Sequence, residues 1–505
     1  MPPLGTPLAH SKFSLNSAGV AGFFGGKEAI SAMATVHLYT GRRWLGWYNS
    51  PGSYTIAKRF GRMANSRFWD GLFPGPNDPP ATSFALDGKQ GPKYIAALSG
   101  TTMQTGHLGY LTMERSKDME PTDIPGRETA SVCVSYLAMK KVNYETPVEL
   151  QPLKDALVAI IPITCSVAAC VFSALVCDWY SFSSILLGIF SSGLASCVIG
   201  AGKLVLKTVK KPADGCPPGH GVLFGEHDIV VIKGNESDVN AITKGHFDLE
   251  TDSQEGSKKK NQQQGNKETD SQQGRKETES QQGTKENGSR QIFKAKGAVR
   301  CYHAIGCSSL LLAFQFLFQL QLIPQASLVG QIMVLSSLGV SWAYNSYLSS
   351  LEKEKTQAKI LFQKLDNPEM LRFCTGTRTT MAVFVCLLLF HGVDVREERK
   401  GELFTKALRS CIPNDTVVWK RWLALVVEQL LHLPDSLPRL ENADGDQENR
   451  ADSEPFPHLK NLEEGDSDLT KQDRNLLNQL LNDARSAIKG YFTFRDRLPN
   501  DSSHD

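Results

Sequence analysis

Three long stretches of this 505-residue chain contain no charged residue, and they limit the possible folds more than any other feature. They cover residues 156–177, 181–202 and 301–351, whereas the 55 Lys and Arg and the 53 Asp and Glu lie in the rest of the chain. A soluble globular domain does not separate its charges in this way. The pattern predicts a membrane protein. It excludes a collagen-like chain, a fully disordered chain and a nucleic-acid binder that is basic throughout.

The first two stretches predict a transmembrane hairpin over residues 155–203. Each is long enough to cross a bilayer as a helix, which takes about 20 residues. Only Asp178, Trp179 and Tyr180 separate them, so the turn must be tight and both ends of the hairpin face the same side.

The third stretch predicts a second transmembrane hairpin over residues 301–351. It has room for helices at about 304–323 and 327–347, with a turn at Ile323-Pro324-Gln325. The expected fold class is therefore mainly α: an integral membrane protein with four transmembrane helices in two hairpins, cytosolic amphipathic helices and long disordered segments.

Positive residues flank both hairpins on one side only, and the two connections on the far side contain none. By the positive-inside rule, we expect both termini and the loop between the hairpins to be cytosolic. The flanking residues are Lys140, Lys141, Lys154, Lys203, Lys207, Lys210, Lys211, Lys294, Lys296, Arg300, Lys353, Lys355 and Lys359.

A shorter apolar run at residues 379–393 is ambiguous. Its 15 residues are more typical of a buried or interfacial segment than of a bilayer crossing. Arg372 and Arg378 could snorkel and lengthen it. Basic residues lie on both sides of the run, however, so we favour a helix that does not cross.

The segments before and between the hairpins are predicted to be cytosolic. Residues 1–150 are rich in Gly, Pro and Ser and show no sustained hydrophobic period, so we expect a largely irregular region. Residues 204–250 predict a small element with strands at 228–232 and 246–249 around a short helix at 237–243. Residues 251–291 carry a nine-residue repeat without aliphatic or aromatic side chains, which predicts disorder.

The C-terminal part divides into three segments. Residues 352–434 predict a cytosolic helical region, with a polar helix at 351–365 and an amphipathic helix at 419–433. Residues 435–468 contain eleven Asp and Glu against three Lys and Arg and predict an acidic disordered linker. Residues 469–490 predict a final amphipathic helix that docks on the other cytosolic helices.

We find no catalytic, cofactor-binding or metal-binding motif, and we expect no enzyme. The segment 22–28 departs from a phosphate loop because Ala21 and Glu28 stand where the motif has Gly and Ser or Thr. Two sets of Cys and His residues lack the paired spacing of zinc modules. These sets are Cys216, His220 and His227, and Cys301, His303 and Cys307.

Basic and aromatic residues alternate between Arg42 and Trp69. This pattern fits single-stranded nucleic acid, an anionic membrane surface or an ordinary solvated chain. Nucleic acid is the least favoured of the three, because the chain already carries membrane helices.

Several uncharged polar residues lie inside the predicted transmembrane helices: Gln315, Gln319, Gln321, Gln331 and Asn345. Gln315 and Gln319 share one helix face, which permits either an amide-lined conduction path or hydrogen bonds between helices. Ser192, Ser196 and Gly200 form a ridge of small residues suited to close packing within the bundle or between the subunits of a homo-oligomer.

The segments 322–362 (LIPQASLVGQIMVLSSLGVSWAYNSYLSSLEKEKTQAKILF) and 228–250 (DIVVIKGNESDVNAITKGHFDLE) resemble uncharacterised multi-pass membrane proteins of fungi. The resemblance extends over the C-terminal two thirds of the chain. It implies the same multi-pass topology and supplies no activity.

Together these features predict a multi-pass membrane protein that acts as a membrane-anchored cytosolic scaffold or adaptor. Its expected partners are the lipid bilayer and cytosolic proteins. The alternative is a small oligomeric channel or transporter lined by the intramembrane glutamines.

Overall fold

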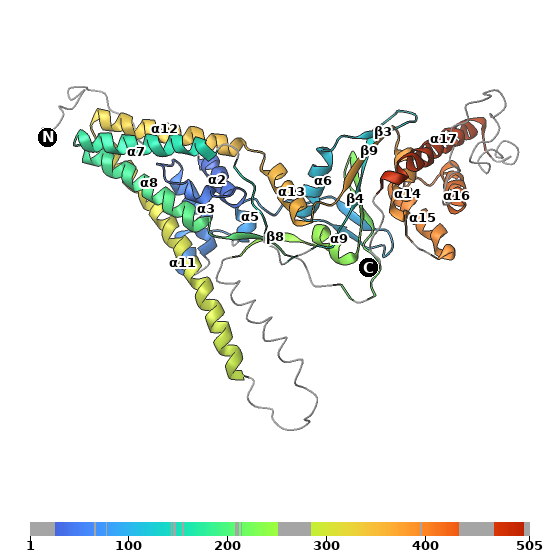
Figure 1. The fold of residues 1–505 in the computed structure, drawn as a ribbon, viewed down its shortest axis with the longest axis horizontal. Coiled ribbons are helices and arrows are strands. Elements are labelled where there is room, and N and C mark those ends of the chain that lie inside the picture. Colours follow the sequence, from blue (N-terminus) through green and yellow to red (C-terminus); the bar gives the residue numbers. More distant parts are fainter. Residues whose placement is uncertain are drawn as a thin grey trace, which may run out of the picture. The chain divides into compact units, whose positions relative to one another are not determined.

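The computed structural model describes residues 26–64, 67–76, 78–142, 144, 148–153, 156–207, 212–213, 215–250, 284–393, 396–433 and 469–498. The described chain is mainly helical, as predicted. It divides into two compact units (Figure 1). Each unit is assembled from three separate segments: Met1–Gly88, Tyr144–Lys207 and Phe247–Ile360 in the first, and Lys89–Asn143, Thr208–His246 and Leu361–Asp505 in the second.

Three apolar helices of the first unit are long enough to cross a membrane, counted over the described residues. The first is Ala156–Leu175, which includes α7 (Ile160–Leu175). The second is α8 (Trp179–Ile199). The third is His303–Gln325, which contains the end of α11 (Thr284–Leu322). A fourth helix, α12 (Leu328–Ser350), has sufficient length but a more polar composition, and it is not among the three.

Both expected turns are present, and one carboxylate joins them. Asp178 caps the N-terminus of α8, where it accepts hydrogen bonds from the backbone N–H and the hydroxyl of Ser181 at 3.2 Å. The same carboxylate accepts from the N–H of Ser327 at 2.8 Å and from its hydroxyl at 2.6 Å. Ser327 caps α12 and follows the turn η5 (Ile323–Gln325). Four donors therefore compensate a charge that is only 7% exposed.

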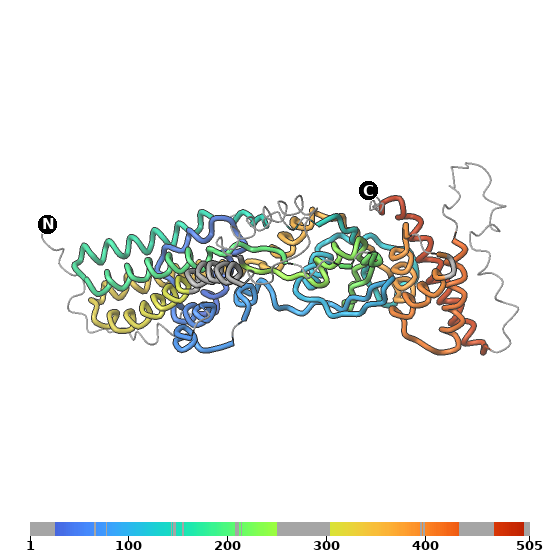
Figure 2. Tube along the Cα trace, turned by 90° about the horizontal axis from the view of Figure 1, so that it is seen from below, coloured from blue at the N-terminus to red at the C-terminus, as the bar shows by residue number. Residues whose placement is uncertain are grey.

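The N-terminal part of the first unit is helical, which corrects the prediction of a largely irregular region. Its α2 packs against α12 and its α3 against α11, so these short elements lie beside the apolar helices (Figure 2). The sequence signal was missed because no element exceeds nine residues, which is too short for a sustained period. The elements are α2 (Gly26–Ala34), η1 (Thr35–His37), η2 (Arg42–Trp44), α3 (Ser53–Phe60), η3 (Gly61–Ala64), α4 (Arg67–Leu72) and α5 (Pro80–Ser83).

Three further elements complete the first unit. The strands β5 (Lys203–Lys207) and β8 (His246–Glu250) form a two-stranded sheet, and α13 (Lys353–Lys364) is the expected polar helix that leads into the second unit. The start of α11 at Thr284 corrects the prediction of disorder for residues 284–291. A segment without apolar side chains cannot form a core, but it can extend an existing helix.

The second unit is built on a seven-stranded mixed sheet, most of which the sequence did not predict. Strands β4 and β7 are parallel, as are β3 and β9, and the other neighbours are antiparallel. In spatial order the strands are β2 (Thr102–Gln104), β1 (Lys93–Ala96), β6 (Gly221–Phe224), β7 (Asp228–Lys233), β4 (Val132–Ala138), β9 (Met370–Thr375) and β3 (Thr122–Ile124).

Helices cover both faces of this sheet, which explains the continuous apolar run of β7. Ile229 and Val231 join a core formed with α14 (Arg378–Phe390), and by strand alternation Val230 and Ile232 point to the opposite face. There α6 packs on β7, and α9 packs on α6. The covering helices are α6 (His107–Lys117), α9 (Glu236–Thr243), α15 (Glu397–Cys411), α16 (Val417–Leu431) and α17 (Lys471–Phe494), the last followed by η7 (Arg495–Arg497).

The apolar run at 379–393 is accounted for by burial in protein. Ten of the 13 residues of α14 are buried, and the helix packs against β4, β7, β9, α15 and α17. The expected elements at 228–232, 237–243, 246–249, 419–433 and 470–489 are present with shifted ends as β7, α9, β8, α16 and α17. The predictions of disorder at 251–283 and 435–468 lie outside the described residues.

Candidate functional site

A polar loop at residues 46–52 enters the bundle of apolar helices. Pro51 and Gly52 form the turn at its end, and Gly52 has a φ of 74°, a left-handed conformation that suits glycine. The chain then turns back into α3. The N–H of Asn49 donates to the Ser166 hydroxyl at 3.1 Å, and Ser166 lies near the middle of Ala156–Leu175. The loop therefore reaches halfway along the apolar helices.

Small residues on α8 make room for this loop. A Cβ on Gly188 would lie 2.0 Å from the Asn49 side chain, and a Cβ on Gly193 would lie 2.2 Å from the Trp47 ring. On the loop itself, Gly46 leaves room for Ser196 of α8, since a Cβ on Gly46 would lie 2.3 Å from the Ser196 side chain. Ser192, Ser196 and Gly200 are all buried within the unit, so their contacts support packing inside the bundle, the first of the two predicted roles.

The amide side chains predicted to lie within the membrane bind the loop. Gln319 donates to the Asn49 side-chain oxygen at 3.0 Å, and Gln315 donates to the Ser50 carbonyl at 3.4 Å. Asn345 donates to the Ser50 hydroxyl at 3.1 Å. Gln331 instead donates to the Ala326 carbonyl at the turn of its own hairpin, and Gln321 is exposed. Three of the five predicted polar residues thus share one task, which is to compensate the polar groups of the loop.

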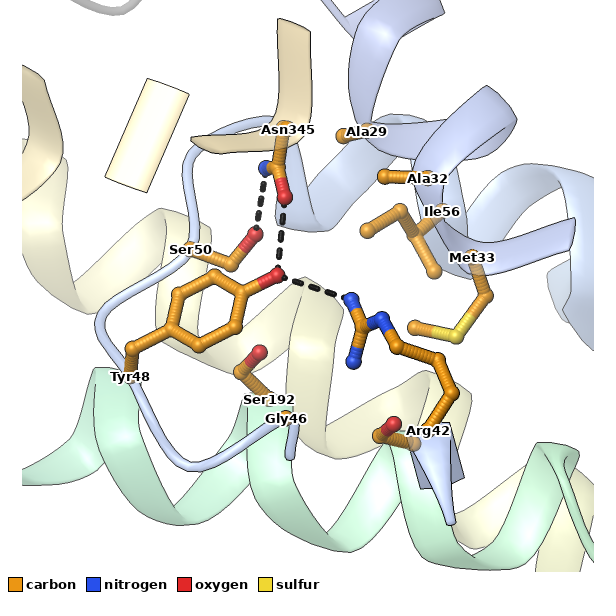
Figure 3. A pocket seen from close by; sticks show the side chains of 11 residues that line it. Ala29, Ala32, Met33, Arg42, Gly46, Tyr48, Ser50, Ile56, Ser192 and Asn345 are labelled. Atoms are coloured by element: carbon orange, nitrogen blue, oxygen red, sulfur yellow. Dashed lines mark hydrogen bonds between the residues drawn. The ribbon is translucent and has the colours of Figure 1, made fainter. Parts of the chain in front are cut away.

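Arg42 lies beneath the loop and is 2% exposed. One Nη2–H donates to the Tyr48 hydroxyl at 3.3 Å, and that hydroxyl donates to Asn345 Oδ1 at 2.8 Å (Figure 3). The guanidinium carbon is also 5.5 Å from the ring centroid of Tyr344. Arg42 Nε and Nη1 have no hydrogen-bond partner. Arginine stays protonated in proteins, so a full positive charge is buried here.

A small cavity adjoins the guanidinium. It leaves about 10 Å³ for the centre of a water molecule, close to the least that holds one water. Its lining residues include no carboxylate: they are Ala29, Ala32, Met33, Arg42, Gly46, Tyr48, Ser50, Ile56, Ser192, Ser196 and Asn345. The arrangement offers hydrogen-bond donors and a positive charge in an enclosed place, so it is suited to binding rather than to proton transfer.

The basic and aromatic cluster between Arg42 and Trp69 is divided by the fold. Tyr48, Phe60 and Trp69 are buried, whereas Trp44 and Tyr54 are exposed. Trp69 donates its indole N–H to His303 at 3.2 Å. Much of the cluster therefore packs inside the unit, which none of the three predicted interpretations included.

The two sets of Cys and His residues are only partly covered by the described side chains, which do not include Cys301. Over the described residues, no group of three or more His, Cys, Asp or Glu side chains could hold a metal ion. Cys216 is exposed, whereas His220 is buried and accepts from the N–H of Gly234. His303 binds Trp69 as described, and most of the phosphate-loop-like segment 22–28 lies outside the described residues.

A pair of thiols spans two strands in the second unit. Cys133 of β4 and Cys374 of β9 are cross-strand partners, and their Sγ atoms are 2.8 Å apart. Burial and, to a smaller extent, the hydrogen bond with Cys374 raise the pKa of the Cys133 thiol to about 11. A thiol with this pKa stays protonated at neutral pH and is a poor nucleophile.

No protein-family model, curated protein or solved structure matches this chain. Its function is therefore argued from the geometry of its own residues.

Replacing Tyr48 with Phe removes the hydroxyl between Arg42 and Asn345 and leaves two buried polar groups without that partner. Each such group costs about 1–3 kcal/mol. We expect the thermal unfolding midpoint of the full chain in detergent to fall by about 5 °C. Tyr54→Phe is the matched control, because the Tyr54 hydroxyl is on an exposed side chain. Equal midpoints for the two variants would contradict the account.

Alkylation of Cys133 should depend steeply on pH. At pH 8 the folded protein holds this thiol protonated, so iodoacetamide should modify it on the order of 100-fold more slowly than an unperturbed exposed thiol. The rate should rise until the pH passes about 11. Cys216, an exposed cysteine in the same unit, is the internal reference in a peptide-resolved mass-spectrometric assay. Equal rates at pH 8 would show that the Cys133 pKa is not raised.

Proposed function

We propose that this chain is a multi-pass membrane protein in which the first unit is an anchor and the second unit is a cytosolic adaptor module. The observation that supports this most strongly is the exposure of large apolar side chains along the helices of the first unit. Leu157 is 78% exposed, Ile161 57% and Leu317 56%. Contiguous apolar exposure of this kind is typical of a surface that faces lipid.

The fourth crossing in this proposal is α12. Its polar residues are directed inward, since Gln331, Ser337, Ser341 and Asn345 are all buried, while Ile332 is 40% exposed. A helix whose polar side chains face the bundle can cross a bilayer despite a lower mean hydropathy. Its pairing with α11 through η5 gives the second hairpin, and four crossings follow.

Orientation rests on the positive residues at the helix ends. Three residues separate the end of α8 from Lys203, and two separate the end of α12 from Lys353. Both belong to the same side of the two hairpins. We therefore place the termini, the repeat near Gly265 and the second unit in the cytosol.

The adaptor role follows from the character of the second unit. Its sheet has a closed core, while Val417 of α16 is 68% exposed and Leu431 is 42% exposed. These two side chains lie at opposite ends of α16 and are the points at which we expect a partner to bind. The resemblance to fungal multi-pass membrane proteins agrees with this topology and stays a prediction.

The alternative is a small channel or transporter. It would use the polar interior of the bundle, and the buried Arg42 beside a cavity is the observation in its favour. Against it, Gln315 and Gln319 are occupied by the loop at residues 46–52. An adaptor needs no path through the bundle, so it is the proposal that we favour.

Glycosylation reporters test the topology. We expect no modification at reporters placed at the N-terminus, near Gly265, after Lys400 or at the C-terminus, and full modification of a reporter inserted between Cys177 and Asp178. The inserted site is the positive control, provided that the loop is lengthened enough to reach the transferase. Modification after Lys400 and at the C-terminus alone would mean that α14 crosses the bilayer and that the second unit is not cytosolic.

Photo-crosslinking distinguishes an adaptor from a channel. A photoreactive residue at Val417 should give a discrete protein adduct in cells, whereas the same residue at Leu157 should react with lipid alone. In parallel, purified protein in liposomes should conduct no ions. Ion flux that is abolished by Gln315→Leu with Gln319→Leu, and retained in the exposed-amide control Gln321→Leu, would favour the channel and overturn the adaptor proposal.

A further inference from the structure

We propose that the cavity beside Arg42 binds a small monovalent anion of halide size. This inference does not rest on the adaptor role, because it concerns charge balance inside the first unit. The argument has three parts: the charge that has to be compensated, the donors that remain unused, and the size of the space.

The charge of Arg42 has no counter-charge among the residues that line the cavity. The side chain is 2% exposed, and its described contacts are the neutral Tyr48 hydroxyl and the Tyr344 ring. Glu28 lies on α2, which contributes other residues to the lining, but it is not itself a lining residue, and its buried Oε2 has no hydrogen-bond partner among the described residues. Enclosing an unpaired guanidinium is costly, and an anion in the cavity would offset part of that cost through its attraction to the charge.

The unused hydrogen-bonding groups around the cavity are donors. Arg42 Nε and Nη1 have no partner, and neither does the hydroxyl of Ser196. Two acceptors of the lining are already engaged, since Asn345 Oδ1 accepts from Tyr48 and the Ser50 hydroxyl accepts from Asn345 (Figure 3). A site with a cation and spare donors selects an anion over a cation. Water would satisfy the donors but would leave the charge uncompensated.

The size of the space limits which anion fits. About 10 Å³ is available to the centre of a water molecule, so the cavity accommodates a single small atom or ion. Ala29, Ala32, Met33 and Ile56 form an apolar wall that offers nothing to the further oxygen atoms of sulfate or phosphate. Halides are singly charged single atoms, so they are the expected ligands. Chloride is somewhat larger than water, and the flexible Met33 side chain of the lining has to shift to admit it.

The test is direct binding of radioactive chloride to the purified full-length protein in detergent, in a buffer with gluconate as the only other anion. We expect one saturable site per chain, competed by bromide and not by sulfate. Arg42→Gln should weaken binding at least tenfold, because it removes a charge-assisted interaction. The matched control is Arg43→Gln. Arg43 is the next residue in the chain, stacks on Trp44 and does not line the cavity, so this variant should bind like the wild type.

A second variant keeps the proposal testable if Arg42→Gln does not fold. Ser196→Ala removes one donor with almost no change in shape, and we expect chloride to bind it severalfold more weakly. Three results would overturn the proposal: no saturable chloride binding by the wild type, which would mean that the cavity holds only water; equal binding by the wild type and a folded Arg42→Gln variant; or unchanged binding by Ser196→Ala when Arg42→Gln is unfolded.

Discussion

Polar groups enclosed by apolar helices must find hydrogen-bond partners inside the protein. The loop at residues 46–52 brings its backbone and side-chain polar groups among the apolar helices, where they need such partners. The first unit is organised by this requirement. Gln315, Gln319 and Asn345 are turned inward toward the loop, and Gly188 and Gly193 of α8 leave room for its Asn49 and Trp47 side chains. At the turns, the enclosed carboxylate of Asp178 is likewise compensated inside the protein, because it accepts four hydrogen bonds. Arg42 is a second enclosed charge, and its Nε and Nη1 have no hydrogen-bond partner among the described residues, which is why the anion site is inferred there.

The two units cannot be separated by one cut in the chain. Three segments build each unit, and the chain passes between them repeatedly. The sheet of the second unit joins β4, β7 and β9, which come from all three of its segments. Correct folding of the second unit therefore requires the chain on both sides of each apolar hairpin. In the proposed topology this places all three segments in the same compartment, as the distribution of Lys and Arg around the hairpins predicts.

Elements with long, uninterrupted signals could be predicted from the sequence. The apolar helices, their turns at Asp178 and Ile323–Gln325, and the amphipathic α16 and α17 follow from patterns of 15 or more residues or from charge and proline at the turns. The sheet was missed because β1, β2 and β3 have only three or four residues and pair with distant partners. The candidate site was missed for another reason: Arg42 and Tyr48 were interpreted as part of a surface cluster. Only the fold brings them to Asn345, almost 300 residues away.

The central claim is that the N-terminal segment packs among the apolar helices, and thiol cross-linking in native membranes tests it most directly. The rings of Tyr54 on α3 and Phe316 on α11 stack with centroids 5.4 Å apart. In a cysteine-free chain with a protease site in the repeat, Tyr54→Cys with Phe316→Cys should be joined by a short cross-linker, so that the two fragments stay together after cleavage. Phe314→Cys, on the opposite face of α11, should not cross-link. Fragments that separate in the first pair would contradict the account.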